Sequence, residues 1–448
     1  MKKSYVYIAC LIVFLLAIVA IVVKYNNSEK EKESMVYELL PRKGAANESK
    51  EWKEVQKKAG VLFEALKQDP NDINASLKLA ALYIQEARES GNYMYYDRAA
   101  MKSVNTVLKI DSLNFNGLVF KSLIYLSQHH FAEGLAAAQK ARSVNPYNAY
   151  VYGLMVDGNV EMGNYDSAVA DADKMVSIRP DLTSYSRVSY LREIFGNYKS
   201  SIEAMKMAAE AGGQGDEHTE WTRVQLASLY EKTGDYKTAE NLYRQSLSMR
   251  PNYPYALAGL ARVAVAANDN KKAIELYEKA DGLINDNSMK EELVDLYRQS
   301  GQDKKATDLA KQIIEDLSKD AEAGDKDESI GHYADRELAY AYLKVNNVDK
   351  ALEHALLEYN RRPENIDANE TVAWVYYSKG EYSKALPYIK TALKTNSKNP
   401  VLLSRAGMIF LKSGEKEMAK NMLQQASGTN SYVGYTLKAE TTTAMQSL

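Results

Sequence analysis

Apolar residues along this chain recur at helical spacing, in two stripes separated by a short polar turn. In one segment Leu226, Ala227 and Tyr230 share a face of a predicted helix. Gly234 follows that stripe, as expected just past the end of a helix, and Pro251 ends the next one because its ring cannot continue a helix. The second stripe consists of Ala239, Leu242, Tyr243 and Ser246. The pattern predicts two helices joined by a tight turn.

This helix–turn–helix unit returns along the chain with a period of about 34 residues, which is typical of helical repeats. Its turn is plainest at 163–168 and is repeated at 234–239 and 380–385. A sustained period of this length predicts a solenoid of stacked helix pairs. Each turn leads to a small residue, which we expect where two helices cross too closely for a larger side chain. These small residues are Ala99, Gly134, Ala168, Ser201, Ala239, Ala273, Ala306, Ala351, Ala385 and Ala419.

The order of residues within each copy carries a family resemblance. An apolar residue, a small residue, a Tyr, a Gly turn, a second aromatic residue, an Ala and a Pro follow one another over roughly residues 60–426. This order resembles the tetratricopeptide repeat. The resemblance implies an all-α, right-handed superhelical solenoid of antiparallel helix pairs, whose first helices line a concave face that binds proteins. It implies no reaction, because fold and function separate easily.

The predicted organisation has five parts. Polar, glycine-bearing insertions near 210–219 and 318–332 are expected to be loops that interrupt the stack, either as hinges between sub-blocks or through drift in loop length. The parts are a short cytoplasmic N-terminus at 1–4, a transmembrane signal-anchor at 5–23, a polar tether at 24–50, a solenoid of about ten repeats at 51–426, and a C-terminal cap or tail at 427–448.

Residues 5–23 form an uncharged, apolar run that follows Lys2 and Lys3. As a helix the run would be about 28 Å long, close to the ~30 Å hydrocarbon core of a bilayer. A cleaved signal peptide is the alternative, but the run ends at 21–23 in Ile-Val-Val and not in a small-x-small site. Cys10 offers a lipidation site, although the apolar run continues well beyond it. We expect an uncleaved, single-pass anchor.

The charges that flank this run are nearly tied under the positive-inside rule. Two lysines and the terminal amine precede it, and three lysines follow it through Glu38. The beginning Met-Lys-Lys resembles an export signal. We therefore expect the inner (cytoplasmic) membrane of a bacterium, with the solenoid on the extracytoplasmic side. A cytoplasm-facing adaptor is the alternative.

The composition of the chain mainly excludes classes of function and of site. The 57 basic residues balance 59 acidic ones, and the chain has no basic stripe of the kind that binds nucleic acid. A single cysteine rules out disulfides within the solenoid. The five histidines make no His-Glu-x-x-His motif and no i, i+4 pair, and His129 and His130 are expected in a solvated turn. We expect no enzyme activity, no cofactor and no metal site.

Candidate binding residues follow from the resemblance. In that family the positions −18, −15, −11 and −8 relative to each small residue face the concave side, and Tyr, Trp and Arg are typical of binding hot spots. We expect a membrane-tethered scaffold or assembly factor that binds protein or peptide partners in the cell envelope. The alternative is a structural or self-associating spacer. The predicted groove residues are Tyr150, Asp157, Tyr190, Trp221, Tyr255, Arg262, Asp295, Arg298, Tyr333, Arg336, Tyr340, Glu370, Trp374 and Tyr377.

Overall fold

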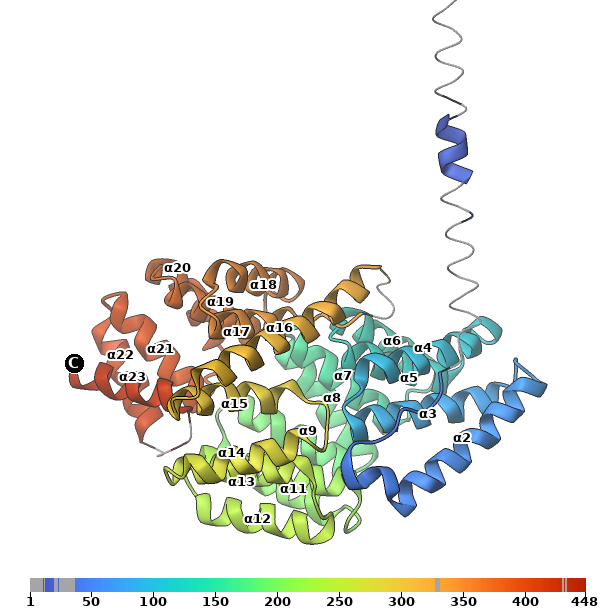
Figure 1. Ribbon diagram of the computed structural model, residues 1–448, viewed down its shortest axis with the longest axis horizontal. Helices are drawn as coiled ribbons and strands as arrows, with labels where there is room; N and C mark the ends of the chain where they lie inside the picture. Colours follow the sequence, from blue (N-terminus) through green and yellow to red (C-terminus); the bar gives the residue numbers. More distant parts are fainter. Residues whose placement is uncertain are drawn as a thin grey trace, which may run out of the picture. The chain divides into compact units, whose positions relative to one another are not determined.

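The computed structural model describes residues 11, 13–19, 23, 37–326, 331–428, 431 and 433–448. Arg42–Leu448 form one compact unit, and helices make up its regular secondary structure (Figure 1). Of the predicted anchor at 5–23, residues 11, 13–19 and 23 are helical, and the other positions lie outside the described residues, as do 24–36 of the predicted tether. Among the helices that are described, none combines the length and the apolar character needed to cross a bilayer.

Consecutive helices of the described chain pack as ten pairs, from α3–α4 to α21–α22. The first helices are α3 (Ile73–Ser90), α5 (Phe115–Ser127), α7 (Ala149–Glu161), α9 (Leu182–Ile194), α11 (Glu217–Lys232), α13 (Pro254–Ala266), α15 (Asn287–Gln299), α17 (Asp335–Lys344), α19 (Ile366–Ser378) and α21 (Pro400–Lys412). The second helices are α4 (Tyr93–Ile110), α6 (Phe131–Val144), α8 (Tyr165–Ile178), α10 (Tyr198–Glu210), α12 (Tyr236–Met249), α14 (Asn270–Asp281), α16 (Asp303–Lys326), α18 (Val348–Arg361), α20 (Tyr382–Ala392) and α22 (Lys416–Ser427). Outside the pairs lie η1 (Gly44–Glu48), α2 (Lys50–Gln68) and α23 (Tyr435–Gln446).

The small residues that set the predicted register lie in the core. Ala168, Ala239 and Ala385 are fully buried. At most 1% of the surface is exposed for Ala99, Ser201, Ala273, Ala306, Ala351 and Ala419. In a typical turn, Gly234 adopts a left-handed conformation (φ 81°), which glycine reaches without steric cost. Asp235 then accepts a hydrogen bond from the Thr238 amide at 3.0 Å and caps α12. The predicted helix-pair register is confirmed.

The segment predicted as a loop near 318–332 is helical as far as Lys326. Ile313 and Leu317 of α16 are buried, and Ala321 packs against the same cluster one turn later. The prediction gave weight to the polar residues, but the apolar stripe of α16 continues at helical spacing as far as Ala321. The loop prediction is therefore wrong for residues 318–326.

The polar tether predicted to reach residue 50 ends before Arg42. Arg42 is 7% exposed and donates two hydrogen bonds to Glu86 of α3, from Nε at 2.9 Å and from Nη2 at 2.6 Å. Ser49 accepts a hydrogen bond from the Trp52 amide and caps α2. Because a buried ion pair fixes the chain to α3, residues 42–50 belong to the folded unit.

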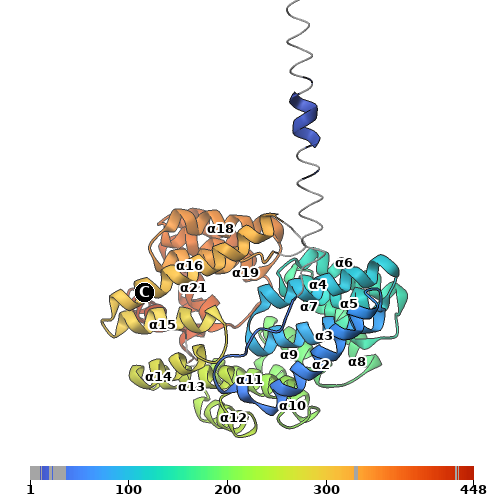
Figure 2. The ribbon, with the colours of Figure 1, turned by 45° about the vertical axis from the view of Figure 1, so that its right-hand side comes forward.

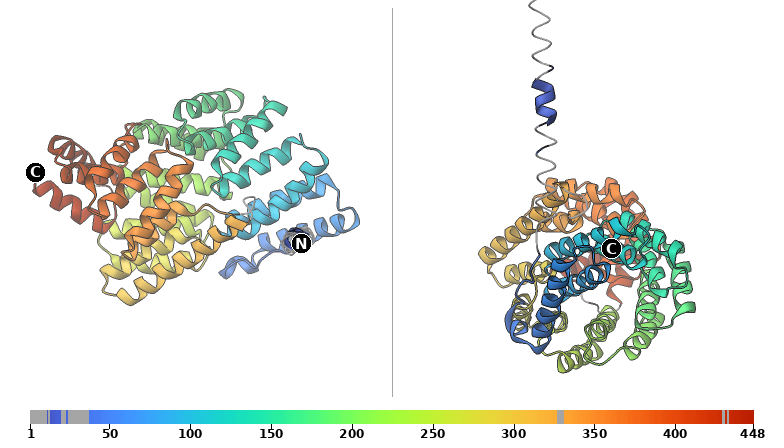
Figure 3. Two further views of the ribbon diagram at one scale, coloured as in Figure 1. Left: turned by 90° about the horizontal axis from the view of Figure 1, so that it is seen from above. Right: turned by 90° about the vertical axis from the view of Figure 1, so that its right-hand side faces the viewer.

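Successive turns of the superhelix touch at regular intervals. Hydrogen bonds join Val160 O to Asn365 Nδ2, Tyr165 Oη to the Ile366 amide, and Lys232 O to Ser431 Oγ, at sequence separations of 205, 201 and 199 residues. The first two contacts bring the end of α7 and the start of α8 against the chain that enters α19, six pairs later. The third brings the end of α11 against the chain that precedes α23. Six pairs thus make one turn, and the right-hand view of Figure 3 looks along this winding, with the blue and teal repeats in front of the red ones.

One buried carboxyl group in this fold gives a stability prediction. Asp97 of α4 is 3% exposed and accepts a hydrogen bond from Ser127 Oγ at 2.7 Å. Burial raises its pKa to about 7, so the fold favours the protonated form. The resulting penalty is fully present above pH 7 and fades as the pH falls toward the unfolded pKa near 4. Asp97→Asn keeps the acceptor and should stabilise the protein at pH 8 by roughly 2–4 kcal/mol.

The measurement is the thermal unfolding midpoint of Asp97→Asn between pH 4.5 and pH 8. The gain in midpoint should shrink steadily as the pH falls. Asp173→Asn, on the exposed face of α8, is the matched control and should change the midpoint little at any pH. A gain for Asp97→Asn that does not vary with pH would contradict the assigned cause.

Candidate functional site

Two adjacent cavities open in the unit. The first has a volume of about 880 Å³ and the second about 750 Å³. Glu291, Arg336 and Tyr340 line both cavities. We call the two cavities together the lumen. The first cavity is lined by α15, α16 and α17 and by the turns that follow α3 and α5, and the second mainly by α15, α17, α19 and α21. Of these helices, α15, α16, α19 and α21 lie on the same side of the unit in Figure 2.

The second cavity contains a preorganised aromatic cluster around one guanidinium group. Arg405 Nη1 donates hydrogen bonds to Tyr340 Oη at 2.8 Å and to Glu370 Oε1 at 3.0 Å. The same guanidinium lies 5.1 Å from the ring centroid of Tyr340 and 4.9 Å from that of Trp374. Trp374 stacks on Tyr377 with a centroid distance of 4.8 Å. Such locked aromatic groups offer contact area at little entropic cost.

Two arginines at this cluster each have a hydrogen-bond donor without a partner among the described residues. The Nε atoms of Arg336 and Arg405 are buried and have no hydrogen-bond partner among the described residues. Burial lowers the pKa of Arg336, but Asp367 and Tyr340 outweigh burial and raise the pKa above its usual value. Both groups are therefore cationic donors whose hydrogen-bonding capacity is incompletely used.

The second cavity also carries more carboxylates than cations. Burial raises the pKa of Glu291 to about 7, although Lys344 opposes this effect. Lys344 Nζ itself donates to Asp295 Oδ2 at 2.7 Å. The acidic lining residues are Glu291, Glu292, Asp295, Asp367, Glu370 and Glu440, against Arg298, Arg336, Lys344 and Arg405. The cavity is thus acidic on balance.

The structure brings part of the predicted groove together. Tyr255 lines the first cavity, Arg336 and Tyr340 line both, and Asp295, Arg298, Glu370 and Trp374 line the second. Tyr377 lies against Trp374.

Other predicted groove residues do not line the lumen. Tyr190 lines a neighbouring cavity of about 220 Å³, which shares Asp367 and Glu370 with the second cavity. Arg262 lines one of about 240 Å³, which shares Tyr255 with the first. Asp157 forms an ion pair with Arg187 at 2.6 Å, and Arg262 one with Glu231 at 2.9 Å. Tyr150 and Trp221 are 37% and 36% exposed and line none of these cavities. Tyr333 lies at a contact between superhelical turns.

The projection from the repeat pattern missed Arg405 and Arg187. Both lie at position −14 relative to their small residues, Ala419 and Ser201, next to position −15, which was projected. Successive residues of a helix are rotated by about 100° around its axis, so side chains at positions −14 and −15 point in partly different directions. Including position −14 in the projection would have found both.

The solvated turn predicted at His129 and His130 is wrong. His130 is 2% exposed, its Nε2 lies 2.7 Å from Gly331 O, and its ring stacks on Tyr333 with centroids 3.9 Å apart. The His129 ring lies 4.2 Å from that of His332, whose pKa is lowered to about 3, chiefly by burial. The next superhelical turn covers these histidines, and no local pattern in the sequence reports that contact.

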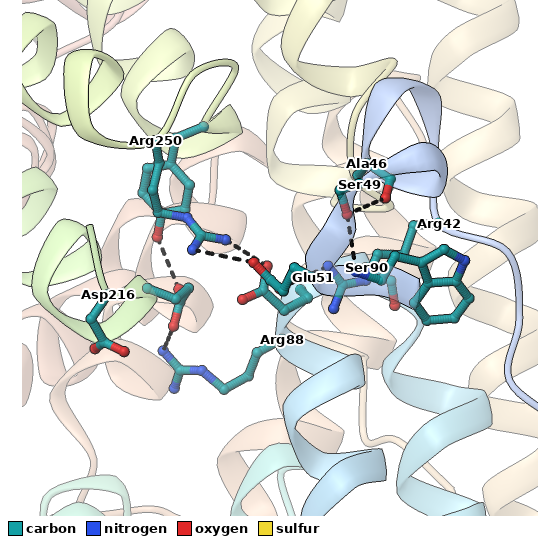
Figure 4. A network of polar contacts seen from close by, with 12 residues as sticks. Arg42, Ala46, Ser49, Glu51, Arg88, Ser90, Asp216 and Arg250 are labelled. Carbon is teal, nitrogen blue, oxygen red and sulfur yellow. Dashed lines mark hydrogen bonds and ion pairs between the residues drawn. The ribbon is translucent and has the colours of Figure 1, made fainter. Parts of the chain in front are cut away.

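A second polar cluster lies at the N-terminal end of the unit (Figure 4). Arg88 pairs with Glu217 at 2.9 Å, and Arg250 pairs with Glu89 at 2.9 Å. Burial raises the pKa of Glu89 to about 7. These pairs tie the end of α3 to the chain entering α11 and α13, beside a cavity of about 450 Å³.

Comparisons with known proteins agree with the fold. Residues 203–288 and 336–400 match the tetratricopeptide repeat family. A stretch of 54 residues is 41% identical to the uncharacterized protein ycf37 of Pyropia yezoensis, and the match spans 12% of this chain and 30% of that protein. Similar solved structures include PilW, a type IV pilus biogenesis factor (16% identity, 44% of this chain and 91% of that chain, TM-score 0.38), and the human IFIT1 dimer with PPP-AAAA (14%, 77% and 79%, TM-score 0.46).

Proposed function

We propose that this chain, of which residues 203–288 and 336–400 match the tetratricopeptide repeat family, is a protein-binding scaffold that holds an extended peptide segment of a protein partner in the lumen. The observation that carries this proposal is the cluster of Arg405, Tyr340 and Trp374. The guanidinium of Arg405 lies against both rings, and all three side chains line the second cavity. They offer aromatic surface and cationic charge to a peptide segment in that cavity.

The balance of charge in the lumen favours a partner segment that carries basic side chains. Glu291 and Asp367 line the second cavity, and the raised pKa of Glu291 reflects a carboxylate that burial penalises. A lysine or arginine of the partner would restore its ionised form by direct pairing. The same acidic residues should exclude acidic peptide segments, because like charges in a confined site repel each other.

The proposal includes a membrane tether at residues 5–23, in the inner membrane, with the solenoid on the extracytoplasmic side. It is supported by the uncharged apolar run in the sequence. A reporter fused after Leu448 measures the orientation, and a reporter active only in the cytoplasm would instead favour the cytoplasm-facing adaptor.

Trp374→Ala tests the binding site. A photo-crosslinker at Tyr340 in living cells first identifies the bound segment, which is then prepared as a peptide. Trp374→Ala should weaken binding of that peptide about 30-fold or more, because it removes the stacked ring on which Arg405 and Tyr377 are fixed. Fluorescence anisotropy gives the affinity, and circular dichroism checks that helicity is unchanged.

The matched control is Tyr147, an aromatic residue that is 83% exposed on the turn before α7. Tyr147→Ala should leave the affinity unchanged, and a crosslinker at Tyr147 should not capture the same segment. Equal affinities for Trp374→Ala and the unmodified protein would place binding outside the lumen.

A further inference from the structure

We propose that His129, His332 and Glu337 form a binding site for a divalent transition-metal ion, with zinc as the best fit, that fastens two turns of the superhelix together. Each of the three residues offers one ligand atom, and these atoms all lie within 4.8 Å of one another. Two imidazoles and a carboxylate are a donor set that suits zinc. The inference does not depend on the proposed peptide binding.

The backbone brings the three side chains together from two distant segments. His129 lies in the turn between α5 and α6, with a left-handed backbone (φ 61°), and His332 lies just before α17. The Tyr333 amide donates a hydrogen bond to Gln128 O at 3.0 Å, so the chains on either side of the site are fixed to each other. Glu337 in the first turn of α17 completes the group.

The His129 imidazole already makes a backbone contact of the kind that metal-bound histidines usually make. His129 Nδ1 lies 3.2 Å from Tyr333 O. A carbonyl oxygen can only accept, so this contact assigns the ring proton of His129 to Nδ1 and leaves the lone pair of Nε2 for an ion. A backbone carbonyl on the second ring nitrogen is the common outer partner of a metal-bound histidine.

Glu337 has unused coordinating capacity at this place. Its Oε1 lies 3.8 Å from His129 Nδ1, which places the carboxylate beside that ring without making Nδ1 the ligand atom. Its Oε2 is buried without a hydrogen-bond partner among the described residues. A buried carboxylate oxygen without a partner costs free energy, and a bound cation would remove that cost. Ligand atoms of a tetrahedral zinc ion are about 3.3 Å apart, given bonds of about 2.0–2.1 Å. The side chains must therefore draw together by about 1.5 Å at most to bind it.

The fourth coordination position would open into the lumen, since all three residues line the first cavity. A zinc site with three protein ligands keeps such a position for water or for a donor from another molecule. A bound ion would have two roles here. It would hold His129 to the start of α17 in the next turn of the superhelix, and it would present a Lewis acid to whatever occupies the cavity.

Calorimetric titration of the full chain with zinc chloride tests the proposal, after purification through a histidine-free tag and treatment with a chelator. We expect one site per chain with a submicromolar dissociation constant. His332→Ala and Glu337→Gln should each weaken zinc binding at least 100-fold. Cobalt(II) should give the visible absorption bands of a four-coordinate ion in the unmodified protein, and these bands should be lost in both variants.

His218→Ala is the matched control, because His218 is exposed at the start of α11 and lies near two carboxylates without joining this group. It should bind zinc as the unmodified protein does. Should His332→Ala fail to fold, Glu337→Gln decides the question because it keeps the shape of the side chain. Absence of zinc binding, or unchanged affinity in Glu337→Gln, would overturn the proposal.

Discussion

Gly163→Ala should open the superhelix, whereas Gly380→Ala should leave it closed. Both glycines occupy the same left-handed position in their turns, with φ of 78° and 80°. A Cβ atom at 163 would lie 2.3 Å from Glu364 O and 2.4 Å from the carbonyl carbon of Glu364, so it would collide with backbone that cannot rotate away. A Cβ atom at 380 would meet nothing within 4 Å in the described chain.

The two variants share the cost of a left-handed alanine, on the order of 1–2 kcal/mol, so the difference between them isolates the collision. Small-angle scattering should show a larger radius of gyration for Gly163→Ala alone. Hydrogen exchange should accelerate at the Ile366 amide, which donates to Tyr165 Oη at 3.0 Å across the contact. Gly414→Ala, also without a neighbour, is a second control. Equal scattering from all three variants would refute the closed winding.

The helix pairs could be predicted from the sequence because their determinants are local. A small residue such as Ala239 packs against the helix just before it in the chain, and the glycine turn lies between them. The same turn motif at Gly163 and Gly380, however, has opposite surroundings. Which turns are covered depends on six pairs completing one revolution, and the repeat period alone does not report the number of pairs per revolution.

The candidate site likewise contains residues that could be predicted from the sequence and residues that could not. Arg336, Tyr340 and Trp374 were predicted because the resemblance to the tetratricopeptide repeat implies that positions −15 and −11 relative to the small residue face the concave side. Glu337 and Arg405 were missed because both lie at position −14, which was not projected. The approach of His129 to Glu337 could not be predicted from any such position, since the two residues belong to different turns of the superhelix.

Arg362→Ala should cost about 3–5 kcal/mol of stability, which is the usual loss when one partner of a buried ion pair is removed. Arg362 is 4% exposed, just past the end of α18, and it donates to Glu358 and, across the superhelical turn, to Glu161. Its guanidinium also lies 4.7 Å from the ring centroid of Phe131. Alanine leaves Glu161 without this cation in a place where burial already raises its pKa.

The sign of the pH dependence follows from that raised pKa. When folding favours the protonated form of a carboxyl group, the free energy of unfolding falls as the pH rises. The loss of stability caused by Arg362→Ala should therefore be larger at pH 8 than at pH 5. The urea midpoint measures it at both values. Glu161→Gln in the Arg362→Ala background should recover part of the loss, because it removes the charge that was left unpaired.

Arg244→Ala is the matched control, since Arg244 and Glu240 form an exposed pair within α12, at 2.6 Å. Its loss should stay below about 1 kcal/mol, as is usual for surface pairs. A similar small loss for Arg362→Ala would mean that Glu161 and Arg362 are solvated in solution. The two turns would then be joined at this place by other contacts, such as the hydrogen bonds that Asn365 Nδ2 and the Ile366 amide donate.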